Sequence, residues 1–397
     1  MKRKPSGLIA GAALLALLSL LGVGAAVLEK AAAAQSKGQV QAPTFEVDPL
    51  WPKPLPNHWL LGSTIGVSVD ARDHVWIIHR SESLDQKEVM ATQKPPGGVC
   101  CFAAPPVLEF DQAGNLIGHW GGTGEGYEWP RSNHGITVDY RGNVWIGGND
   151  DTDSQVLKFT QSGKFMMQIG RHGMSRGSND TDNPHGAAKL FLDQATNELY
   201  VADGYFNKRV IVYDGDSGKY KRHWGAYGSK PDDTDLGPYN PAAPPAKQFR
   251  SPVHCADLSN DGFLYVCDRS NDRLQVFRKD GTFVKEKIIE PMTLSDGSVW
   301  DVAFSRDPQQ KYLYLADGVN ERIYVLLRDT LEILTSFGDG GRQPGQFYAV
   351  HSIATDSKGN IYTTETYEGK RVQKFIYKGI GTVTKATQGT VWPGPRK

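Results

Sequence analysis

Short stretches in which apolar and polar residues alternate recur along the chain from about residue 66 to residue 377. Turns rich in Asn, Asp and Gly separate these stretches. Alternation of this kind predicts half-buried β-strands, and the turns predict antiparallel hairpins. No segment after Leu28 keeps a helical period. We therefore expect a protein made almost entirely of antiparallel strands.

The strand pattern is a repeat. Six segments share a first apolar strand, a polar turn and a second apolar strand, and they start at Gly66, Gly135, Gly186, Cys255, Asp301 and Ser352. A unit of about 40 residues with four strands is typical of a propeller blade. The sequence therefore predicts an all-β, six-bladed β-propeller with four antiparallel strands per blade. An up-and-down β-sandwich would not explain such similar repeats.

A closed ring of blades needs a last strand to cover an otherwise open sheet edge. We expect residues 44–48 to pair with residues 371–377 and so complete the sixth blade. An arginine recurs at one blade position, as Arg209, Arg273, Arg322 and Arg371, which predicts ties between strands rather than catalytic groups. Between Gly66 and Tyr377 these motifs resemble those of NHL-repeat propellers.

The N-terminal residues have the order of a secretory signal. Lys2, Arg3 and Lys4 precede an apolar run over residues 7–28, and small residues follow it. The run is also long enough to span a bilayer. We expect an exported protein, periplasmic or secreted, that contacts the membrane only if this segment is retained. The expected parts are a signal peptide or anchor (1–34), a linker (35–44), the propeller (45–380) and a C-terminal tail (381–397).

The charge balance narrows the range of partners. Lys plus Arg and Asp plus Glu number 44 each, so the formal net charge is zero. This balance gives no electrostatic reason for nucleic-acid binding or for attraction to an acidic membrane surface. We expect a monomer.

Four cysteines in an exported chain are consistent with disulfides. Cys255 and Cys267 lie equally far from Asp261, the centre of a turn, so a hairpin would place them opposite each other within bonding distance. Cys100 and Cys101 are adjacent, in a loop over residues 81–106. They form either a vicinal disulfide or two free thiols.

One residue directly precedes the first strand of each unit, and four of these six residues are histidines. The six are Ile65, His134, His185, His254, Trp300 and His351. First strands line the channel of a propeller, so these side chains should surround one of its mouths. His134, His254 and His351 belong to alternate blades. Three imidazoles with a fourth position left open are typical of a catalytic zinc site. His185 stays open as a fourth ligand, a proton carrier or a hydrogen-bonding group of the channel.

On the same residues the chain resembles the peptidyl-α-hydroxyglycine α-amidating lyases, which are six-bladed propellers. His134 precedes Gly135 and a similar strand, His254 follows Gln-Phe-Arg-Ser-Pro-Val, and His351 follows Pro-Gly-Gln-Phe-Tyr-Ala-Val. The resemblance implies a zinc ion bound by these three histidines. It also implies roles for three further residues, which are Tyr205 as the catalytic base, Arg80 beside it, and Arg269 as the group that binds a substrate carboxylate.

The reaction implied by the resemblance breaks the C–N bond of an α-hydroxyglycine and yields an amide and glyoxylate. Ser352 departs from the family, which has an Asp after the third histidine, and this departure argues against the calcium ion of the family's axial site. The alternative function is a non-catalytic NHL-repeat propeller that binds a ligand or a protein at the mouth of its channel.

Overall fold

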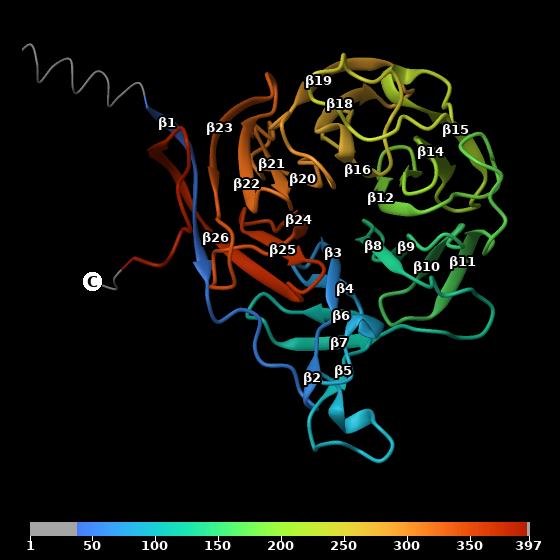
Figure 1. Cartoon of the computed structure of the whole chain (residues 1–397), viewed down its shortest axis with the longest axis vertical. Coiled ribbons are helices and arrows are strands. Elements are labelled where there is room, and N and C mark those ends of the chain that lie inside the picture. Colours follow the sequence, from blue (N-terminus) through green and yellow to red (C-terminus); the bar gives the residue numbers. More distant parts are fainter. Residues whose placement is uncertain (1–37, 395–397) are drawn as a thin grey trace, which may run out of the picture.

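The computed structural model describes residues 38–394. These residues form six four-stranded antiparallel sheets around a central axis, as the ribbon in Figure 1 shows. The described residues contain no α-helix, and their helical turns are four 3-10 segments, Ser81–Ser83, Met90–Thr92, Ala226–Gly228 and Arg269–Asn271. The predicted all-β, six-bladed propeller is confirmed. The expected signal segment lies outside the described residues.

Each blade follows the chain from the inner strand to the outer strand. The strands of the first three blades are β3 (Ser63–Val69), β4 (Val75–Arg80), β6 (Val107–Phe110), β7 (Leu116–Trp120); β8 (Asn133–Val138), β9 (Val144–Gly148), β10 (Gln155–Phe159), β11 (Phe165–Gly170); and β12 (Ala187–Asp193), β13 (Glu198–Asp203), β14 (Arg209–Asp214), β15 (Tyr220–Trp224). Those of blades four and five are β16 (Val253–Leu258), β17 (Phe263–Asp268), β18 (Arg273–Arg278), β19 (Phe283–Ile288); and β20 (Asp301–Phe304), β21 (Tyr312–Asp317), β22 (Arg322–Leu327), β23 (Glu332–Phe337).

The sixth blade closes the ring with strands from both ends of the described chain. Its order is β24 (Val350–Thr355), β25 (Ile361–Glu365), β26 (Arg371–Thr384) and β1 (Gln39–Asp48). Phe45 lies opposite Tyr377, as predicted, but the pairing extends to Gln39 opposite Thr384. Because β26 is long enough to offer partners to this earlier segment, residues 39–44 and 381–384 belong to strands rather than to the expected linker and tail.

Acidic turn residues explain why the repeated hairpins form. Asp139 accepts hydrogen bonds from the backbone N–H groups of Arg141 and Asn143 and, at 2.9 Å, from the indole of Trp145. In the same way, Asp70 accepts hydrogen bonds from the backbone N–H groups of Arg72 and His74 and from the indole of Trp76. Each carboxylate thus fixes a tight turn and anchors a fully buried tryptophan between neighbouring blades.

The recurring arginines act as ties, as predicted, in three of the four blades. Arg209 donates to Asp203 at 2.7 Å inside blade three, where both side chains are fully buried. Arg273 pairs with Asp268 in blade four, and Arg371 pairs with Glu365 in blade six. In blade five, Arg322 instead donates to the backbone carbonyl of Asn320.

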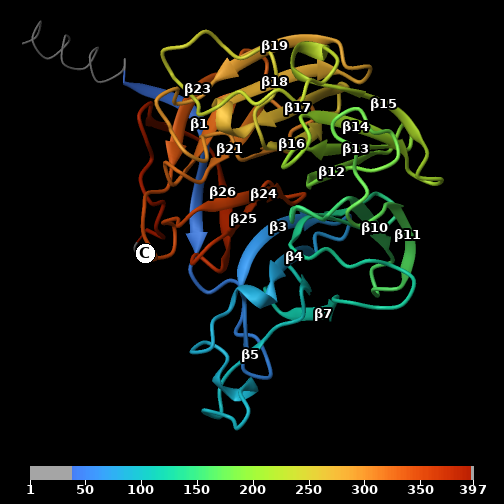
Figure 2. The same cartoon turned by 45° about the vertical axis from the view of Figure 1, so that its right-hand side comes forward.

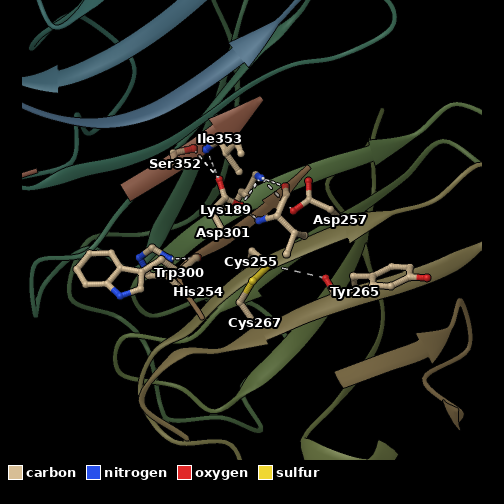
Figure 3. The surroundings of a disulfide bond; sticks show 11 residues. Lys189, His254, Cys255, Asp257, Tyr265, Cys267, Trp300, Asp301, Ser352 and Ile353 are labelled. Carbon is tan, nitrogen blue, oxygen red and sulfur yellow. Dashed lines mark hydrogen bonds and ion pairs between the residues drawn. A yellow bond between two sulfur atoms is a disulfide. The ribbon is translucent and has the colours of Figure 1, made fainter. Parts of the chain in front are cut away.

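Both cysteine pairs form disulfides. Cys255 and Cys267 face each other directly across β16 and β17, as the symmetry of the hairpin predicts, and their bond appears in Figure 3. Cys100 and Cys101 are also bonded, which decides between the two alternatives for that pair. They lie in an insertion that projects from blade one in Figure 2, where β2 (Trp59–Leu60) pairs in parallel with β5 (Phe102–Ala103). Within residues 38–394 no helix meets the length and hydropathy needed to cross a bilayer.

Candidate metal centre

The three histidines of alternate blades converge at the channel. His134, His254 and His351 lie near the starts of the inner strands β8, β16 and β24. Their ring centroids are 4.7–5.2 Å apart, and each side chain is almost completely buried. One ligand atom from each lies within 4.8 Å of the others. The triad predicted from the sequence is therefore present as a compact group that could hold a metal ion.

Each imidazole is oriented by the inner strand of the next blade. The Nδ1 atoms of His134, His254 and His351 lie 2.7, 2.5 and 2.6 Å from the backbone carbonyl oxygens of Ala188, Trp300 and Ile65. Because a carbonyl oxygen can only accept, each Nδ1 carries the proton and each Nε2 carries a lone pair. This second shell of carbonyls is the arrangement that fixes the tautomer of metal-binding histidines.

The surroundings keep the three imidazoles neutral. Burial lowers the pKa of His134, His254 and His351 well below the usual 6.5, and the neighbouring positive charges act in the same direction. Arg269 and Arg80 are among those charges for His134 and His351. The neutral imidazole is the form that binds metal. The three rings are neutral, they carry their proton on Nδ1, and their ligand atoms lie close together. The triad therefore fits a divalent metal ion.

His185 lies outside this group. Its ring stacks on Phe206 at 4.6 Å, and its Nε2 lies 2.7 Å from the carbonyl oxygen of Asp151. The residue of blade three at the triad's position is Ala188, which precedes the turn residue Asp193 by five positions. In every blade the residue that faces the channel precedes the turn residue by five positions. The channel residues are Ile65, His134, Ala188, His254, Trp300 and His351, and the turn residues are Asp70, Asp139, Asp193, Ser259, Ser305 and Asp356 in the same order. This spacing is the sequence signal that separates His185 from the triad.

The other three candidate residues surround the triad. Tyr205, in the turn between β13 and β14, places its hydroxyl 2.8 Å from Nε2 of His134 and 3.2 Å from Nε2 of His254. The Arg269 guanidinium lies 5.8 Å from the centroid of the Tyr205 ring. Arg80 ends β4 and donates to the Asn133 carbonyl and to the Asn149 side chain.

Two residues of this mouth were not predicted from the sequence, whereas Trp300 was among the expected channel residues. The Arg269 guanidinium stacks on the ring of Trp300 at 4.5 Å and forms an ion pair of 3.1 Å with Asp296. The hydroxyl of Tyr367 donates to the other carboxylate oxygen of Asp296 at 3.0 Å. Asp296 and Tyr367 lie in loops without a repeated motif, so no pattern in the sequence marks them.

An ion cluster of Lys189, Asp257 and Asp301 lies next to the triad, and Figure 3 shows these three side chains together with His254. Lys189 Nζ is 2.6 Å from Asp301 and 3.0 Å from Asp257. Asp301 also accepts hydrogen bonds from the Ser352 hydroxyl and the Ile353 N–H. Although burial alone would lower it, the pKa of Lys189 is raised by the two carboxylates. An ammonium ion thus already pairs with both of these carboxylates, which makes them poorer ligands for a calcium ion.

Replacing Lys189 by methionine is expected to destabilise the protein by about 3 kcal/mol, because two buried carboxylates lose their counter-charge. Burial already raises the pKa of Asp257 to about 7, so this carboxyl is charged at pH 8 and mostly protonated at pH 5. The loss in free energy of unfolding caused by the substitution should therefore be largest at pH 8 and smaller at pH 5. Thermal denaturation at both pH values measures it. The control is Lys279→Met at the more exposed pair with Asp193, expected to cost less than about 1 kcal/mol. Equal losses in both variants would contradict the prediction.

Sequence comparison finds relatives of two kinds, although no family model matches the chain. Peptidyl-glycine alpha-amidating monooxygenase B of Xenopus laevis is 26% identical over 244 residues, which cover 59% of this chain and 25% of that protein. Peptidyl-alpha-hydroxyglycine alpha-amidating lyase 1 of Drosophila melanogaster is 24% identical over 361 residues, 85% of this chain and 60% of that protein. NHL repeat-containing protein 3 of Mus musculus is 26% identical over 365 residues, 85% and 86% of the two chains.

These matches establish homology at modest identity. The chain spans about a quarter of the length of the amidating monooxygenases that it matches. A solved structure described as a streptogramin B lyase has a TM-score of 0.48 and 10% identity, and covers 86% of this chain and 98% of that one. By its own sheet topology the chain is a six-bladed propeller, and by sequence it is homologous to the amidating lyases and to NHL repeat-containing protein 3.

Proposed function

We propose that this protein is a zinc-dependent lyase that cleaves the C–N bond of an α-hydroxyglycine-type substrate and releases an amide and glyoxylate. The observation that carries the proposal is the buried triad of neutral imidazoles with the Tyr205 hydroxyl within hydrogen-bonding distance of two of them. The amidating lyase of Drosophila melanogaster, which matches over 85% of this chain, supports the same reaction.

The donor set favours zinc. His134, His254 and His351 would hold the ion through Nε2, and three histidine ligands leave a position open, as in catalytic zinc sites. When bound, zinc would acidify a hydroxyl group that binds at the open position. The carbonyls of Ala188, Trp300 and Ile65 would hold the three rings in place.

Tyr205 is the base in this proposal. Its oxygen lies beside the triad, where it can take the proton of the substrate hydroxyl. Arg80 forms no ion pair within the described residues, and its charge interacts with Tyr205, so it would stabilise negative charge on the phenol oxygen. As the C–N bond breaks, its electron pair goes to nitrogen, which accepts a proton, and the C–O bond becomes a carbonyl. The reaction needs no oxidant or reductant.

The proposal also includes an exported location and a small-molecule or peptide substrate for a monomeric enzyme. The disulfide between Cys255 and Cys267 supports the exported location, because such bonds persist in oxidising compartments.

A second candidate is a non-catalytic NHL-repeat propeller that binds a ligand or a protein at the channel mouth. The observation in its favour is the match to NHL repeat-containing protein 3, which covers 86% of that protein.

Zinc content and turnover separate the two candidates. We expect the purified protein to carry about one zinc ion per chain and to convert N-benzoyl-α-hydroxyglycine to benzamide and glyoxylate. Removing the zinc with a chelator should abolish turnover, and adding zinc should restore it. A zinc-loaded, folded protein that cleaves none of a series of α-hydroxyglycine derivatives would support the non-catalytic candidate instead.

A further inference from the structure

We propose that Asp296 is a specificity-determining residue, which makes the site prefer an uncharged group, such as an amide carbonyl, to a free carboxylate on the hydroxylated carbon of the substrate. This inference rests on the proposed function and gives Arg269 a role different from the one that the family resemblance implies. The substrate class is then a carbinolamide in which an amide or ester replaces the free carboxylate of an α-hydroxyglycine, so that the second product is glyoxylamide or a glyoxylate ester in place of glyoxylate.

The charge of Arg269 is already neutralised within the protein. Its Nη2 atom forms an ion pair of 3.1 Å with Asp296, and its guanidinium carbon lies 4.5 Å from the centroid of the Trp300 ring. The Arg269 side chain is 8% exposed and that of Asp296 is 39% exposed, so water reaches the pair from the Asp296 side and screens it in part. A substrate carboxylate would have to displace Asp296 or add a second negative charge next to it.

The loop that carries Asp296 is held against Arg269 on both sides. Gly297 has a φ of 75°, and a Cβ atom there would lie 2.0 Å from the Arg269 carbonyl oxygen, so only glycine allows this approach. The Gly297 carbonyl accepts from the Trp300 indole at 2.7 Å. Tyr367, from the sixth blade, donates to Asp296. Asp296 is therefore placed by the fold, and its contact with Arg269 is not a chance encounter of two flexible side chains.

The remaining hydrogen-bonding capacity of Arg269 fits a neutral acceptor. Its Nε–H is buried and finds no hydrogen-bond partner within residues 38–394. A side-on carboxylate would use Nε and Nη2 together, and there it would meet the Asp296 carboxylate, which already accepts from Nη2. A single carbonyl oxygen needs only the Nε–H group. The buried Nε–H thus offers a donor beside an ion pair that is already neutral, which suits an amide or an ester carbonyl.

The two arginines of the mouth therefore differ in charge balance. Arg80 donates to a backbone carbonyl and to an Asn side chain, and no carboxylate pairs with it within the described chain. The charge of Arg80 interacts with Tyr205 more strongly than with the carboxylates of Glu82 and Asp153, whereas the charge of Arg269 is already paired with Asp296. In this proposal Arg80 stabilises negative charge on the base Tyr205, and Arg269 recognises a neutral group of the substrate.

The test compares N-benzoyl-α-hydroxyglycine with its amide as substrates of the zinc-loaded wild-type protein and the Asp296→Asn variant. We expect wild type to cleave the amide with a kcat/KM about tenfold or more above that of the acid, mainly through KM. Asp296→Asn should lower KM for the acid by about tenfold, since it frees the charge of Arg269. Tyr367→Phe, which keeps the Asp296 charge, is the matched control and should retain the amide preference.

Binding of mandelate and mandelamide, measured by calorimetry, tests the same inference without turnover. Wild type should bind mandelamide more tightly, and Asp296→Asn should gain affinity for mandelate alone. If no substrate is cleaved but this binding pattern holds, the proposed function fails while the specificity role stands. Equal or tighter binding of mandelate by wild type, or no gain in Asp296→Asn, would overturn the inference.

Discussion

Replacing His134, His254 or His351 by alanine is expected to abolish stoichiometric zinc binding in each single variant. Every ring contributes one Nε2 to a single group of ligand atoms, and two imidazoles do not form a complete protein ligand set for zinc. The apparent affinity should fall by more than about a hundredfold, since loss of a direct ligand exceeds the effect of losing a second-shell partner. Elemental analysis of the purified variants, together with a competition assay against a chelator, measures the loss.

His185→Ala is the matched control for this series. His185 lies in the neighbouring blade, stacks on Phe206 and binds a backbone carbonyl, so its loss should leave the zinc content unchanged. Circular dichroism and melting temperatures identify variants that fail to fold. Retention of one zinc per chain in any folded triad variant, or equal loss in His185→Ala, would contradict the assigned ligand set.

The fold could be predicted because local and global signals agree in every blade. An Asp or Ser five residues after the channel position fixes each hairpin turn, and alternating apolar residues bury one face of each strand. The same regularity makes the triad predictable, since equivalent positions in alternate blades must converge on one axis. The error at His185 came from aligning blade three on a glycine rather than on the turn residue Asp193.

The remaining contacts of the site could not be predicted, because they join residues that do not recur from blade to blade. Asp296 and Tyr367 come from loops of different blades, and their meeting at Arg269 depends on how those loops fold over the mouth. Lys189 reaches carboxylates in blades four and five, more than 60 residues away along the chain. Such pairs become visible only when the blades are placed around the axis, because nothing in the local sequence distinguishes them from surface charges.

Replacing Tyr205 by phenylalanine is expected to reduce turnover by about a hundredfold or more while leaving the zinc in place. The variant lacks only the hydroxyl that lies 2.8 Å from His134 and 3.2 Å from His254, so the proposed base is lost and the ligands are kept. Steady-state kinetics with N-benzoyl-α-hydroxyglycine or its amide, on protein of measured zinc content, gives the result.

Tyr220→Phe is the control for loss of a phenol that contacts an imidazole. Its hydroxyl lies 2.9 Å from Nδ1 of His223 on the outer strand of blade three, far from the channel. Both variants lose one hydrogen bond, worth about 1 kcal/mol, so their melting temperatures should fall by similar small amounts. Turnover should fall only in Tyr205→Phe, because only that hydroxyl lies where the substrate proton must go. A fully active, zinc-replete Tyr205→Phe protein would remove Tyr205 from the mechanism, and a large loss of stability in that variant would show that its role is structural.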